Sequence, residues 1–245
     1  MTHFSSIRRP CAGVRKAIAC AATVLFAGTT FAAAIAQESL SDLSSKEVAK
    51  GLREALIQGA RKAADELGKP DGFLGNAKVK IPLPATLQRV ESVMRNVGMG
   101  KQSDELVTTM NRAAEAAVPE AKPLLIAAVK RMTVQDAKGI LSGPDDAATE
   151  YFRKTTSDAL TARFLPIVKQ ATSKVKLADT YNNFAGMASS FGLLDKKNAN
   201  LDTYVTQKAL DGLFLMMADE EKTIRKNPVG AATDIVKKVF GAIGR

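Results

Sequence analysis

Residues 44–67 read SSKEVAKGLREALIQGARKAADEL, and the spacing of their apolar side chains predicts one amphipathic helix. Ser44 and Glu47 stand three apart as in a capping box, which satisfies free backbone amides at the start of a helix. Gly68 and Pro70 follow the stretch, and both residue types end helices. The apolar face consists of Val48, Leu52, Leu56, Ala60, Ala63 and Leu67. This face has to be buried, so the stretch predicts a domain in which helices pack on helices.

The same helical spacing recurs along most of the remaining chain. Apolar periodicity and the breaks at proline and glycine predict further helices at residues 87–97, 103–117, 124–132, 133–143, 146–155, 157–176, 177–190, 202–226 and 228–241. Thr133 and Asp136 form a second predicted cap, and Pro166 should kink or divide its helix. Val79 and Ile81 alternate with lysines, as in a short extended segment. We therefore predict an all-α fold, a single orthogonal multi-helix domain of about ten helices with one irregular loop.

The N-terminus has the three parts of a secretory signal. Residues 1–16 carry four basic and no acidic residues, residues 17–37 are uncharged, and Ala34-Ile35-Ala36 has the small-x-small pattern of a cleavage site. An uncleaved membrane anchor is the alternative, because about 20 uncharged residues can cross a bilayer. We predict a signal peptide at residues 1–36, a single domain at residues 37–245, and a periplasmic or secreted location.

Cleavage after Ala36 would remove the chain's only histidine and both cysteines, which are His3, Cys11 and Cys20. It would also remove four basic residues and so lower the formal net charge from +10 to +6. The remaining 209 residues, which contain no tryptophan, would have no imidazole base, no thiol and no disulfide. We predict no metal and no cofactor. The modest charge and few aromatic residues argue against a nucleic-acid partner.

Several longer motifs are distinctive. They read LGKPDGFLGN at 67–76, IPLP at 81–84, RAAEAAVPEAKP at 112–123, DDAATEYFR at 145–153 and YVTQKALDGLF at 204–214. In this order the motifs resemble a family of exported bacterial proteins known as the domain of unknown function numbered 4197. The resemblance extends from about Leu40 to the C-terminus. It implies an all-helical protein exposed in the cell envelope, and it implies no activity and no catalytic residues.

Eight polar residues in or beside these motifs are candidates for a binding site: Asp71, Asn111, Glu115, Tyr151, Arg153, Tyr204, Lys208 and Asp211. The loop around Asp71 either presents its backbone amides to a ligand or is structural, with Phe73 and Leu74 in the core. Asp145 and Asp146 precede a predicted helix, where capping is favoured over metal binding.

Helical spacing groups the other candidates. Glu150 lies within reach of Arg153, and Lys208 lies near both Tyr204 and Asp211, so each group is either a surface ion pair or part of a polar cleft. Asn111 and Glu115 stand four apart beside an apolar face, as a buried polar pair would. If these groups converge, the site could hold an anionic or polar small molecule.

These observations favour a non-catalytic binding module for a small polar or envelope-derived ligand. One alternative is an envelope enzyme that uses carboxylate, lysine and tyrosine chemistry, and another is a peripheral membrane-associated protein. The second alternative depends on residues 228–245, where Ile235, Val239 and Phe240 are interleaved with lysines. Such a helix either contacts an anionic membrane surface or docks its apolar side on the core.

Overall fold

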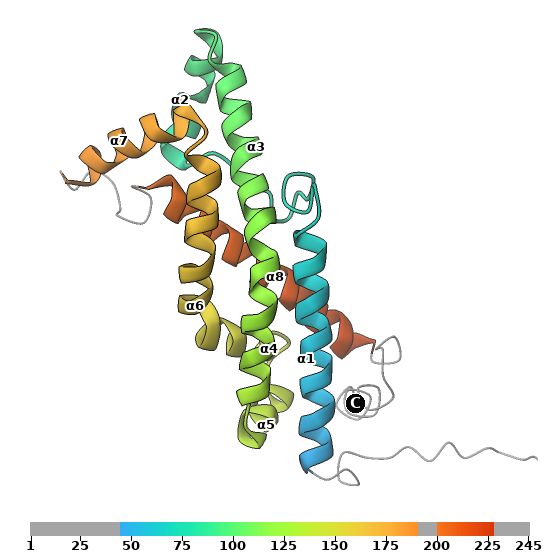
Figure 1. Cartoon of the computed structure of the whole chain (residues 1–245). Helices are drawn as coiled ribbons and strands as arrows, with labels where there is room; N and C mark the ends of the chain where they lie inside the picture. The colour runs from blue at the N-terminus through green and yellow to red at the C-terminus, as the bar shows by residue number, and fades with distance from the viewer. Residues whose placement is uncertain (1–44, 191–199, 228–245) are drawn as a thin grey trace, which may run out of the picture. The chain divides into compact units, whose positions relative to one another are not determined.

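The computed structural model describes residues 45–190 and 200–227, all within one unit that spans residues 38–245 (Figure 1). Three predictions lie outside the described residues: the signal at 1–36, the cap residue Ser44 and the helix at 228–241. Every regular element within the described ranges is a helix, and no strand occurs there. The predicted all-α fold class is confirmed.

The described residues form eight α-helices and one short 3₁₀-helix, η2. Their bounds are α1 Ser45–Leu67, α2 Ala85–Asn96, α3 Gly100–Ala117, η2 Val118–Glu120, α4 Ala121–Arg131, α5 Val134–Ser142, α6 Ala147–Thr172, α7 Lys176–Ser190 and α8 Leu201–Lys226. The count is eight and not ten for two reasons: the two helices predicted at 146–155 and 157–176 are one helix, α6, and the helix predicted at 228–241 lies outside the described residues. The predicted cap of α5 is confirmed, since Thr133 and Asp136 make both hydrogen bonds of a capping box.

The helix α6 continues where the sequence predicted breaks. The polar run at residues 155–157 does not end it, because all three hydroxyls donate to carbonyls of the preceding helical turn. Pro166 does not divide it either. A proline in a helix loses one backbone hydrogen bond and crowds the preceding turn. The neighbouring Phe164 and Val168 are fully buried, and this packing offsets the local cost.

The helices form a layer that one long helix crosses. The elements α3, η2 and α4 follow one another end to end; α6 packs on α3 and α4, and α1 packs on α4 (Figure 1). The helix α8 crosses this layer and contacts α1, α3 and α6. All six apolar residues predicted on the face of α1 are buried. No described helix is both long and apolar enough to span a membrane.

Candidate functional site

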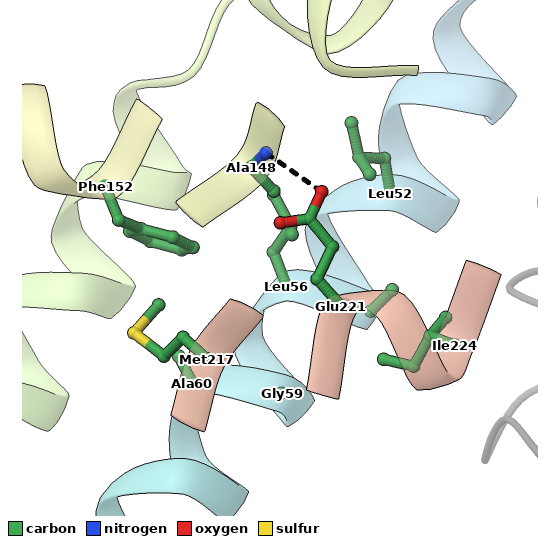
Figure 2. A pocket seen from close by; sticks show the side chains of 10 residues that line it. Leu52, Leu56, Gly59, Ala60, Ala148, Phe152, Met217, Glu221 and Ile224 are labelled. Atoms are coloured by element: carbon green, nitrogen blue, oxygen red, sulfur yellow. Dashed lines mark hydrogen bonds between the residues drawn. The ribbon is translucent and has the colours of Figure 1, made fainter. Parts of the chain in front are cut away.

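A small pocket, open on one side to solvent, lies between α1, α6 and α8 (Figure 2). Its ten lining residues are Leu52, Ala55, Leu56, Gly59, Ala60, Ala148, Phe152, Met217, Glu221 and Ile224. Nine of them offer only hydrocarbon, aromatic or thioether surface. The small residues Ala55, Gly59 and Ala60 of α1 leave space on one side of the pocket. Larger side chains line the other sides: Phe152 of α6, and Met217 and Ile224 of α8.

Glu221 is the one charged residue in this lining. Its carboxylate caps the N-terminus of α6. It accepts hydrogen bonds from the backbone amides of Ala148 and Thr149 at 3.0 and 2.9 Å, and from the Thr149 hydroxyl at 3.0 Å. Free amides in the first turn of a helix favour a negative charge. Asp146 stands at the N-cap position, but its side chain makes no capping hydrogen bond. The prediction that Asp146 caps this helix was therefore wrong, because a carboxylate from α8 takes that role.

Arg225 balances the charge of Glu221. Its Nη2 lies 2.8 Å from Oε1 of Glu221 and also donates to the Ile140 carbonyl at 2.8 Å. The two side chains are only 9% and 6% exposed. The Glu221 carboxylate is thus already hydrogen-bonded and paired within the protein, and a bound molecule would contact mainly apolar side chains. No group of three or more His, Cys, Asp or Glu side chains in the described residues is placed to hold a metal ion.

Two of the predicted site residues, Asp71 and Glu115, fasten the loop at 68–76 to α3. Oε1 of Glu115 accepts the amides of Phe73 and Leu74 at 3.0 and 3.1 Å. Its Oε2 lies 2.7 Å from Arg112, which also pairs with Asp71 at 2.8 Å. The hydrogen bond to Glu115 raises the pKa of the Arg112 guanidinium, although burial opposes the shift. The structural interpretation of this loop is supported, since both amides are occupied and Phe73 is fully buried.

Asn111, a third predicted site residue, holds the next part of the same connection. Its side-chain oxygen accepts the amide of Ile81 at 2.8 Å, and its Nδ2 donates to the Ile81 carbonyl at 2.9 Å. The Asn111 side chain thus makes the two hydrogen bonds to the Ile81 backbone that a neighbouring strand would otherwise make. Val79, Ile81 and Leu83 are buried and alternate with exposed residues, so the predicted alternation is present although no strand forms.

Tyr151 and Arg153 lie on α6. The Tyr151 hydroxyl donates to the Ala128 carbonyl of α4 at 3.2 Å. Arg153 pairs with Glu150 at 3.1 Å, as its spacing predicted, and its guanidinium carbon lies 4.7 Å from the ring centre of Phe214. Both side chains therefore contribute to packing between helices.

Tyr204, Lys208 and Asp211 lie on α8. The Tyr204 hydroxyl donates to the Pro82 carbonyl at 3.1 Å, and Lys208 lies 3.8 Å from Asp211. None of the eight predicted residues lines the pocket. That they bind a ligand stays a prediction. The sequence did not point to Glu221, because its partners at Ala148 and Thr149 are 73 and 72 residues away.

Burial gives Tyr204 a measurable pH dependence, because it raises the pKa of its phenol to about 12. An exposed tyrosine ionises at about pH 10, so the unfolded state releases this proton first. The contribution of Tyr204 to stability is complete below about pH 10 and is lost as the pH rises through the folded-state pKa. We expect the free energy of unfolding to fall more steeply above pH 10 in the wild type than in Tyr204→Phe. Parallel curves from urea denaturation would contradict this.

Comparison with known proteins gives one match. A family model described as a protein of unknown function (DUF4197) matches residues 42–241. No curated protein and no solved structure matches the chain.

Proposed function

The chain belongs to the DUF4197 family, and we propose that it is an exported, non-catalytic binding module whose pocket between α1, α6 and α8 holds the apolar part of an envelope-derived molecule. The single observation behind this proposal is the pocket itself, a small apolar hollow with one charged lining residue. The export part of the proposal rests on the sequence of residues 1–36.

The lining of the pocket supports an apolar ligand. Small-molecule sites typically have mostly apolar walls with few polar groups. Moving apolar surface from water onto such walls contributes roughly 25 cal/mol per Å². The carboxylate of Glu221 is already paired with Arg225 and two backbone amides, so it offers little attraction to a charged group. A hydrocarbon chain or ring fits these walls better than the polar ligand that the sequence suggested.

A side chain at Gly59 tests the proposal, because Gly59 lines the pocket from α1. A Cβ there would lie 3.9 Å from the Ile224 side chain, an ordinary contact, so a leucine would extend into the hollow without a backbone clash. We expect Gly59→Leu to weaken binding of the neutral fluorescent probe N-phenylnaphthylamine at least tenfold. Fluorescence titration gives the dissociation constant.

The matched control is Gly139→Leu on α5. Nothing lies within 4 Å of a Cβ at Gly139, which is exposed, so the same substitution there leaves the pocket open. Both variants replace a helical glycine, and both should be slightly favourable for the helix. Equal probe affinities in the two variants would refute the proposed site. Competition by decanol in the control, and its loss in Gly59→Leu, would support a hydrocarbon ligand.

A further inference from the structure

We propose that the pocket between α1, α6 and α8 is also the docking site of the chain's own C-terminal segment, residues 228–245. The apolar side chains of this segment would compete with a ligand for the same walls. The consequence for ligand binding rests on the proposed function, whereas the docking itself does not.

The position of the pocket supports this occupant. Ile224 lines the pocket, and α8 ends two residues later at Lys226. Asn227 has left the helical conformation, with φ −134° and ψ 72°, and it precedes Pro228, which disfavours a continued helix. The helix α8 therefore ends within three residues of a side chain that lines the pocket. A helix of about 14 residues is about 20 Å long, which is ample to cover a hollow that starts at Ile224.

The chemistry of the segment also fits. At helical spacing Val236, Val239, Phe240 and Ile243 share one face, and Lys238 lies opposite. The apolar face of such a helix needs a partner, and the pocket offers apolar walls that include Ile224, three residues before the described chain ends. With the proposed signal removed, the residues before α1 are 37–44, which read QESLSDLS and offer only two apolar side chains. The C-terminal segment is the better occupant.

The family match includes both parts of the chain. It extends from residue 42 to residue 241 and so includes both the walls of the pocket and most of the apolar face of the segment. The matched unit is therefore not complete at the end of α8.

A single tryptophan reports on docking without any ligand, because the chain contains no other. In Phe240→Trp we expect blue-shifted emission and protection from acrylamide quenching. Adding Gly59→Leu, which fills the pocket, should abolish the protection, whereas adding Gly139→Leu should not. Emission typical of water in Phe240→Trp alone would overturn the proposal. So would protection that survives Gly59→Leu, because the segment would then be docked elsewhere or bound to another copy.

Probe binding separates this inference from the proposed function. We expect Val236→Gln with Phe240→Gln to strengthen N-phenylnaphthylamine binding about tenfold, because an occupied site lowers apparent affinity by the fraction that is free. The matched control, Lys237→Gln with Lys238→Gln, should leave the affinity unchanged. If Gly59→Leu blocks the probe but the apolar pair has no effect, the docking proposal fails and the binding proposal survives. If tryptophan protection depends on Gly59 but no variant alters probe binding, the binding proposal fails and the docking proposal survives.

Discussion

Replacing Glu115 with alanine should lower the free energy of unfolding by about 2–4 kcal/mol, a large fraction of the stability of an ordinary domain. The carboxylate is buried and accepts the amides of Phe73 and Leu74 as well as a bond from Arg112. The substitution removes the partner of two backbone donors and of one cation at once. Urea denaturation followed by circular dichroism would measure the loss.

Two further variants show which property of Glu115 matters. Glu115→Gln keeps an oxygen for the two amides but loses the charge beside Arg112, so it should cost less, about 1–2 kcal/mol. Glu105→Ala, an exposed site on the same helix, should change stability by no more than about 0.5 kcal/mol. If Glu115→Ala were no more harmful than Glu105→Ala, the fastening of the loop to α3 would be refuted.

The fold was largely predictable from the sequence, because helices are specified by near neighbours. The face of α1 from Val48 to Leu67 and the cap at Thr133 need only a few adjacent residues, and both are confirmed. The continuity of α6 through Pro166 was not predictable in this way. It depends on the burial of Phe164 and Val168 against other helices, which no local pattern reveals.

The candidate site was much less predictable, because distant segments build it. Leu52 and Phe152 were recognisable only as apolar residues, and nothing in their neighbourhoods shows that a hollow remains between them. Conversely, Asn111 and Glu115 were recognisable as unusual polar residues on a buried face. Their partners are backbone groups of residues 68–84. Polar residues on a buried helix face are unusual, and here they are explained by holding this connection in place.

The close approach of Phe73 to Gly212 leads to the second large effect. The Phe73 ring comes from the loop at 68–76, is fully buried and lies against α8. Phe73→Ala should therefore lower the free energy of unfolding by about 3–5 kcal/mol, through lost apolar burial and the cavity left behind.

A Cβ at Gly212 would lie only 2.7 Å from Cε1 of Phe73 and 3.3 Å from Cβ of Val79. Gly212→Ala should thus destabilise the wild type by about 1–3 kcal/mol, even though alanine favours helices.

The same substitution should change sign when the ring is absent. In a Phe73→Ala background the closest obstacle is gone, and alanine at position 212 gains about 1 kcal/mol from its better helix propensity. We therefore expect Gly212→Ala to be neutral or stabilising there, which a double-mutant cycle of urea midpoints would show as strong coupling. An equal cost in both backgrounds would mean that the glycine serves something other than the ring. Coupling of the expected sign would establish that two of the motifs, one in a loop and one on α8, are a single packing unit.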